Sequence, residues 1–300
     1  AFLILNNINP SNILSLTFTN KSAKEMINRA QNMIPNHNIN NLWIGTFHSI
    51  FAKILRIEAE IIGYNNNFTI LDNEDSKNII KRIIKDKSLD SEVYKPNAIF
   101  AKISLLKNNM ISPQKYNQSE ELIKKDRETR QIEFSSIYRK YEETCKKNES
   151  MDFDSILVNT LNLLNNSKEI LEKYQNKFRY TLIDEFQDTN ILQLEIIKKI
   201  VNKNQNLCVV GDDSQSIYSF RGANINNILN FRKLFPKAEE FKLEQNYRSS
   251  KIIVEAANKL IENNSRKLEK KIWTNKTEGE KIKVIETNSD NEEGFIIASA

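Results

Sequence analysis

The pattern of apolar and polar positions alternates between strand and helix signals near the start of the chain. Residues 12–20, NILSLTFTN, have the apolar density of a buried strand, and residues 22–34 carry apolar side chains at helical spacing. Ser22 and Glu25 match a Ser-x-x-Glu capping box, which predicts that the helix begins there. Residues 42–50, LWIGTFHSI, predict a second strand that runs into a helix.

A long helical block separates two regions of this alternating pattern. From about Glu74 to Asn166 the spacing is nearly all helical, and no strand signal interrupts it. The alternation then resumes with a strand at 179–185, a helix at 190–201, and strands at 206–213 and 241–247. Strands that alternate with helices indicate a parallel sheet with helices on both faces, so we expect an α/β fold with an inserted helical domain.

The segment LIDEFQDTN, residues 182–190, places three carboxylates directly after an apolar strand. Ligands of parallel sheets bind at the carboxyl ends of the strands, where Asp184 and Glu185 would lie. One carboxylate there can hold Mg²⁺ and its neighbour can accept a proton from an attacking water, which suits nucleotide hydrolysis. Two other interpretations stay open: Asp188 caps the following helix, and the pair taken alone forms a solvated acidic turn.

Composition limits the class of protein without deciding it. A chain of 300 residues, 39% hydrophobic and 28% charged, can bury a sizeable core and suggests two or three domains. It has neither an apolar run of about 20 residues nor a secretory signal pattern, which favours a cytoplasmic location. The formal net charge of +5 permits a polyanionic partner. Cys145 and Cys208 are too few and too far apart to indicate a disulfide framework or a metal cluster.

Five segments occur together in an order typical of one family. They are LTFTNKSAKEM (16–26), GTFHSI (45–50), LIDEFQDTN, VVGDDSQSIYSFRGA (209–223) and LEQNYRSS (243–250). With them the whole chain resembles the UvrD/PcrA/Rep family of superfamily 1 DNA helicases. The resemblance implies a RecA-like parallel sheet of the P-loop NTPase type. It assigns 1–54 and 179–242 to a first RecA-like domain, 55–178 to the inserted helical domain, and 243–300 to the beginning of a second RecA-like domain.

The resemblance also implies roles in binding and hydrolysing ATP. Asp184 would serve Mg²⁺, Glu185 would activate the water, and Gln215 would sense the γ-phosphate. Tyr247 would stack on adenine and Arg248 would contact the γ-phosphate, roles that suit an aromatic face and a guanidinium. Without the family, Tyr247 and Arg248 would be equally well explained as an amphipathic edge with one exposed arginine.

A second group of residues matches the single-stranded DNA track of the family. Its members are Phe18, Asn20, Thr46, His48, Tyr218, Phe220 and Arg221. Aromatic rings interleaved with polar and basic groups suit sequence-independent binding, because every base has a face that can stack. Phe220 stands where several members have tryptophan. Taken alone, Phe18 and Phe47 predict core positions and His48 an ordinary satisfied histidine, and we keep Phe47 in the core.

One motif of the family is absent from these residues. None of the six glycines precedes a Lys-Ser or Lys-Thr pair, so no Gly-x-x-x-x-Gly-Lys-Ser/Thr phosphate loop is present. We expect the loop to lie upstream in a longer protein, and the 300-residue chain alone to be inactive in ATP hydrolysis. The parent is expected to be an ATP-dependent 3′–5′ helicase acting on single-stranded DNA and its junctions with duplex, in repair or replication. Alternatives are the helicase subunit of a helicase-nuclease and a non-hydrolysing DNA-binding module.

Overall fold

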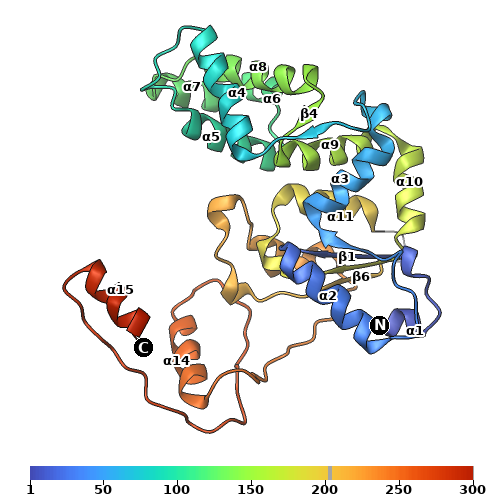
Figure 1. Cartoon of the computed structure of the whole chain (residues 1–300), viewed down its shortest axis with the longest axis vertical. Helices are drawn as coiled ribbons and strands as arrows, with labels where there is room; N and C mark the ends of the chain where they lie inside the picture. Colours follow the sequence, from blue (N-terminus) through green and yellow to red (C-terminus); the bar gives the residue numbers. More distant parts are fainter. Residues whose placement is uncertain (202–204, 300) are drawn as a thin grey trace. The chain divides into compact units, whose positions relative to one another are not determined.

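The structure, a computed structural model, describes residues 1–201 and 205–299. The chain forms two compact units, Ala1–Phe231 and Arg232–Ala300. The first unit, coloured from blue to yellow in Figure 1, contains a parallel sheet and a block of helices. No helix within the described residues is long and apolar enough to cross a membrane.

Four parallel strands form the main sheet of the first unit. β1 (Ile13–Thr17) lies between β2 (Trp43–Thr46) and β5 (Tyr180–Ile183), and β6 (Leu207–Val209) pairs with β5. The register aligns Leu16 with Gly45 on one side and with Ile183 on the other. The carboxyl ends of β1, β2 and β5 therefore meet at one edge of the sheet.

Helices cover both faces of this sheet, as Figure 1 shows. Leu14, Leu16 and Ile183 belong to the larger hydrophobic cluster on one face, whereas Ile13 and Leu182 pack in a smaller cluster on the other. All five residues of β1 are buried, as expected for a strand covered on both sides. The predicted α/β fold is confirmed. The helices of the larger cluster are α3 (Phe47–Glu58), α9 (Phe153–Asn166), α10 (Lys168–Lys177) and α11 (Ile191–Ile200), and the smaller cluster includes the end of α2 (Asn20–Met33).

Threonines at the ends of β1 and β2 begin the helices that follow. Thr19 Oγ1 accepts a hydrogen bond from Ser22 N at 3.0 Å, and Thr46 Oγ1 accepts one from Ser49 N at 3.3 Å. The predicted Ser22–Glu25 capping box is therefore wrong, because Thr19 already supplies the cap and α2 begins at Asn20.

The helical block has a hydrophobic core of its own, built from residues between Leu71 and Cys145. Its helices are α4 (Asn73–Asp86), α5 (Pro96–Asn108), α6 (Pro113–Asn117), α7 (Glu120–Glu128) and α8 (Phe134–Lys147). The parallel pair β3 (Thr69–Ile70) and β4 (Ser150–Met151) joins its two ends. The expectation that no strand interrupts 74–166 is wrong at β4, because a two-residue strand is too short to leave a periodic pattern. The domain limits 55 and 178 stay a prediction.

The second unit contains α14 (Lys251–Glu262) and α15 (Asp290–Ser299). The strand predicted at 241–247 is not formed: this segment has one isolated bridge, between Gln245 and Trp273. Phe241 is 82% exposed, so its apolar side chain is not packed as it would be in a buried strand. The remaining short elements of the chain are α1 (Phe2–Leu5), η1 (Pro10–Asn12), η2 (Ala59–Ile62), η3 (Phe186–Asp188), η4 (Asp213–Gln215), η5 (Ser219–Arg221), α12 (Asn226–Leu229) and α13 (Phe231–Leu234).

Candidate active site and nucleic-acid pocket

The acidic loop after β5, residues 184–188, is held at the carboxyl edge of the sheet by backbone hydrogen bonds. Asp184 N donates to Leu16 O and Phe186 N donates to Val210 O, both at 2.9 Å. Between them Glu185 adopts the left-handed conformation, with φ of 53°. A non-glycine residue in this region costs roughly 1 kcal/mol or more, and such strain is concentrated at functional sites. The backbone at Glu185 is thus fixed by both neighbouring strands.

A chain of hydrogen bonds connects this loop with the segment after β6. Gln187 Nε2 donates to Glu185 Oε2 at 2.8 Å, and Asp212 N donates to Gln187 Oε1 at 3.0 Å. The Asp212 carboxylate in turn accepts from Gln215 Nε2 at 2.8 Å. Glu185 and Gln215, which the family resemblance assigned to ATP hydrolysis, therefore lie in one network.

Among the residues that the structure describes, the three carboxyl groups of the loop have no basic counter-ion. Within residues 1–201 and 205–299 no ion pair involves Asp184, Glu185 or Asp188. Burial raises the pKa of Asp184, and the neighbouring Glu185 charge adds to this effect. A pair of carboxylates in such surroundings is stabilised by a cation. The residues present therefore fit Mg²⁺, with Asp184 as the group that would hold it.

Asp188 does not cap α11. The cap is Asn190, whose side chain accepts from Gln193 N at 2.7 Å, while Gln193 Oε1 accepts from Asn190 N at 3.1 Å. The interpretation of Asp188 as a helix cap is wrong, because the chain makes one more turn, η3, before the helix begins. Asp188 is instead 7% exposed, and its Oδ1 has no hydrogen-bond partner among the described residues.

Protonation of Asp188 is expected to make the stability of the protein depend on pH. Burial, and secondarily the Glu185 charge, raises the pKa of Asp188 from 3.8 to about 6. The folded state then binds the proton more tightly than the unfolded state, so stability falls as the pH rises from about 4 to 6. We expect Asp188→Asn to raise the free energy of unfolding by about 1 to 3 kcal/mol at pH 7.5. The gain should shrink toward pH 4 in urea titrations.

The exposed Asp86 provides a matched control for this substitution. Asp86→Asn should change the free energy of unfolding by less than about 0.5 kcal/mol at either pH. A destabilised Asp188→Asn protein at pH 7.5 would mean that the Asp188 carboxylate is stabilised by its surroundings rather than penalised.

Aromatic side chains from two sequence-distant loops line a pocket of about 550 Å³ in the first unit. The Phe18 and Tyr218 ring centroids lie 4.9 Å apart, and those of Tyr218 and Phe220 lie 6.0 Å apart. Phe18 and Tyr218 are partly buried, while Phe220 is 76% exposed. These three rings, the aromatic row, form a continuous surface on which bases can stack.

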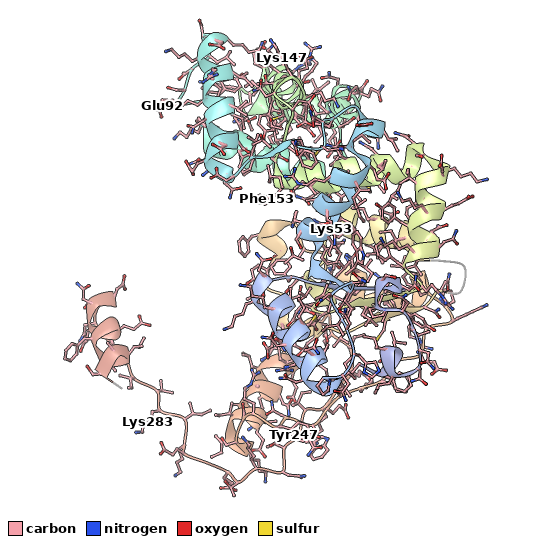
Figure 2. The ribbon with its side chains drawn as sticks, turned by 45° about the vertical axis from the view of Figure 1, so that its right-hand side comes forward. Lys53, Glu92, Lys147, Phe153, Tyr247 and Lys283 are labelled. Carbon is pink, nitrogen blue, oxygen red and sulfur yellow. The ribbon has the colours of Figure 1, made fainter. Side chains whose placement is uncertain are left out.

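The opposite wall of the pocket comes from helices α5 and α9, and the sequence did not predict it. Phe100, Leu105 and Phe153 line this side, and the ring of Phe153 lies 5.7 Å from His48 in an edge-on contact. Figure 2 labels Phe153 on the helical side of the first unit. Its one sequence signal is an aromatic residue at the start of a predicted helix, and the structure leaves its side chain 44% exposed.

Buried amides connect this helical wall to the acidic loop. Asn190 Nδ2 donates to Asn108 Oδ1 at 2.6 Å, and Asn108 Nδ2 donates to Asp154 Oδ1 at 2.9 Å. Asn227 Nδ2 donates to Thr189 O at 3.0 Å. The helical block is thus fixed to the segment that follows the acidic loop.

The remaining residues predicted to contact DNA differ in their positions. Thr46 and His48 line the pocket with Phe18, and Phe47 is buried as expected. Burial lowers the pKa of His48 to about 4, so its imidazole is neutral near pH 7. Asn20 is exposed at the start of α2 and is not among the residues that line the pocket, and the side chain of Arg221 lies outside the described residues.

Tyr247 and Arg248 lie on the second unit, and Figure 2 labels Tyr247 there. The Tyr247 ring is 75% exposed, and its hydroxyl donates to Gln245 Oε1 at 2.7 Å. The Asn246 side chain accepts from Arg248 N at 2.9 Å. Both side chains are accessible to a ligand, and their assignment to ATP stays a prediction.

Two relatives are similar to nearly the whole chain. The chain is 42% identical over 292 residues to the ATP-dependent DNA helicase PcrA of Staphylococcus aureus strain Mu50. The matched residues make up 97% of this chain and 39% of that protein. The chain is 42% identical over 287 residues to the ATP-dependent DNA helicase PcrA of Staphylococcus epidermidis strain ATCC 12228, which covers 96% and 38%. The chain thus spans about two fifths of the length of these curated relatives.

Two family models match consecutive parts of the chain. The UvrD-like helicase C-terminal domain matches residues 241–300, most of the second unit. The UvrD/REP helicase N-terminal domain matches residues 1–236, the part that contains the sheet, the acidic loop and the aromatic row. The chain therefore belongs to the UvrD/REP helicase family.

Proposed function

We propose that the complete protein couples ATP hydrolysis to 3′–5′ movement on single-stranded DNA and unwinds duplex at single-strand junctions, in DNA repair or replication. One observation carries this proposal. A continuous set of hydrogen bonds links Glu185, at the edge of the sheet, to Gln215, which precedes the aromatic row by three residues. The names of the relatives, ATP-dependent DNA helicases, support the same activity.

Hydrolysis is assigned to the acidic loop. Glu185 accepts the proton of the attacking water, and Asp184 holds Mg²⁺, which when bound offsets the charge on the phosphate oxygens. Gln215 and Arg248 contact the γ-phosphate, and Tyr247 stacks on adenine, as the family resemblance implies. Glu185 suits its role because the backbone on either side of it is hydrogen-bonded to β1 and to the residue after β6, and its Oε2 accepts from Gln187.

DNA binding is assigned to the pocket and its aromatic row. Bases stack on Phe18, Tyr218 and Phe220, and Phe153 borders the strand from the helical side. Stacking on rings reads no particular base, which suits a protein that moves along DNA of any sequence. Because His48 is neutral, it contributes a hydrogen bond or ring contact rather than a positive charge.

We expect Tyr218→Ala to weaken binding of the 300-residue chain to single-stranded DNA by about 1 to 3 kcal/mol. Tyr218 is the middle ring of the row, so its removal also leaves Phe18 and Phe220 without their shared neighbour. Fluorescence anisotropy with a labelled mixed-sequence oligonucleotide at fixed salt measures the change. Affinity should also fall as salt increases, because phosphate contacts release counterions.

Phe2 provides a matched control, since its side chain is 76% exposed like that of Phe220 but lies on α1, away from the pocket. Phe220→Ala should weaken binding and Phe2→Ala should leave it unchanged. Equal affinities for the wild-type chain and Tyr218→Ala would remove the aromatic row from the DNA-binding surface.

A further inference from the structure

The amide of Gln187 lies at the centre of the network between the two loops. Its side chain is 1% exposed, and both of its polar atoms are engaged. Asp212 N can only donate and the Glu185 carboxylate can only accept, so the orientation of the amide is determined: Oε1 faces Asp212 and Nε2 faces Glu185. No rotation of the amide by half a turn preserves both hydrogen bonds.

Packing around Gly211 keeps this amide in place. A Cβ atom at Gly211 would come within 2.6 Å of Gln187 Oε1 and 3.2 Å of Phe186 N. The strand end after β6 therefore approaches the acidic loop more closely than any residue with a side chain allows. Ser216 Oγ also donates to Gln187 O, at 3.4 Å. The loop that carries Gln215 thus contacts both the side chain of Gln187, through Asp212 N, and the backbone of Gln187, through Ser216 Oγ.

The same loop continues directly into the aromatic row. The Asp212 carboxylate accepts from Ser214 N at 3.0 Å and from Gln215 Nε2 at 2.8 Å, and Asp212 O accepts from Gln215 N at 2.9 Å, so η4 is fixed to both the side chain and the backbone of Asp212. Tyr218 and Phe220 follow within five residues of Gln215. A shift of the aromatic row on DNA binding would therefore move Asp212 N, and with it the amide that holds the Glu185 carboxylate.

We propose that Gln187 is a positioning residue that sets the orientation of the Glu185 carboxylate and transmits the position of the DNA-binding loop to it. This inference rests on the proposed function, in which Glu185 is the base for ATP hydrolysis. With Oε2 held by Gln187, Oε1 of Glu185 is left to accept the proton from water. The route runs through the protein and needs no contact between Gln215 and the nucleotide.

The test is steady-state ATP hydrolysis by the complete protein with Gln187→Met, with and without single-stranded DNA. Methionine keeps the volume of the side chain and removes both hydrogen bonds. The expected result is a DNA-stimulated kcat reduced by about 10- to 100-fold, the range found for residues that orient metal ligands through hydrogen bonds. The KM for ATP and the Kd for DNA should stay within about threefold, because Gln187 touches neither in the proposed mechanism. The control is Gln175→Met. The Gln175 amide donates to Lys199 O, outside this network, so this variant should have the kcat of the wild-type protein.

A double variant separates positioning from a structural role. If Gln187 acts through Glu185, adding Gln187→Met to Glu185→Gln changes kcat no further, whereas independent effects would multiply. Gln187→Glu provides a second route if the methionine variant folds poorly. It keeps the acceptor for Asp212 N and replaces the donor with a carboxylate, so it should also lose DNA-stimulated turnover.

Three results would count against the proposal in different ways. Normal kcat and normal DNA stimulation in both Gln187→Met and Gln187→Glu would overturn the role of Gln187 alone. Independent effects in the double variant would show that Gln187 acts elsewhere than on Glu185. A wild-type complete protein without DNA-stimulated hydrolysis would refute the proposed function itself, and the inference with it.

Discussion

Replacing Glu185 with glutamine in the complete protein is expected to reduce DNA-stimulated ATP hydrolysis by about 10²- to 10⁴-fold, the contribution of a general base. Glutamine has nearly the same shape and can still orient a water, but it cannot accept its proton. Nucleotide binding should be retained, because Asp184 and the groups assigned to the phosphates are unchanged. A phosphate-release assay and a fluorescent-nucleotide titration measure the two quantities separately.

Glu195 supplies the matched control for this substitution. It lies on α11 in the same unit and pairs with Lys198 at 2.6 Å near the surface. Glu195→Gln should leave turnover within twofold of wild type. Wild-type turnover by Glu185→Gln would remove Glu185 from the role of base and would leave Asp188 as the other carboxylate of the loop to examine.

The main sheet could be predicted from the sequence because its strands are short, apolar and covered on both faces. In β1 every residue is buried, so the strand reads as an almost continuous apolar run. Glu185 could be placed at the carboxyl edge of the sheet because it follows a strand, whereas Gln215 was assigned to the same site by the family resemblance alone. The structure connects the two residues through Gln187 and Asp212, and their catalytic roles stay predictions.

Other features depend on contacts that no local pattern contains. The apolar segment 241–247 resembles a strand, but a strand requires a partner, and this segment has a single bridge. At the start of α11, Asp188 and Asn190 are both suitable caps, and the extra turn η3 decides in favour of Asn190. Phe153 reaches the pocket because α9, which begins with it, packs in the hydrophobic cluster that covers the sheet, and the spacing of its own residues does not indicate this.

A buried charge network in the helical block is expected to govern its stability. Lys107, 2% exposed, lies 2.8 Å from Asp152 Oδ2 and 2.7 Å from Glu142 Oε1. Burial alone would lower the pKa of Lys107, but the charges of Asp152 and Glu142 outweigh it and raise this pKa well above its usual range. Burial would likewise raise the pKa of Asp152, yet Lys107 and the hydrogen bond from the Tyr141 hydroxyl lower it. Each charge therefore depends on its partner to remain ionised.

Lys107→Met is expected to lower the free energy of unfolding of the helical block by about 3 to 5 kcal/mol at pH 7, because it leaves the buried Asp152 and the partly buried Glu142 without a cation. The deficit should shrink as the pH falls toward 4. Without Lys107 both carboxyls would have raised pKa values, so the folded variant takes up protons and gains stability in this range. Hydrogen exchange of peptides from α5 and α8 measures the local free energy, and urea titration measures the total.

An exposed pair on α8 distinguishes the loss of a buried charge from the loss of any lysine. Lys140 is 59% exposed and lies 3.9 Å from Glu143, which is 57% exposed. Lys140→Met should change the free energy of unfolding by less than about 0.5 kcal/mol, since solvent screens such pairs. The proposal fails if Lys107→Met lowers the free energy of unfolding by no more than Lys140→Met does. It also fails if Lys107→Met lowers it by the same amount at pH 4 as at pH 7, because the carboxylates of Asp152 and Glu142 would then not be the source of the instability.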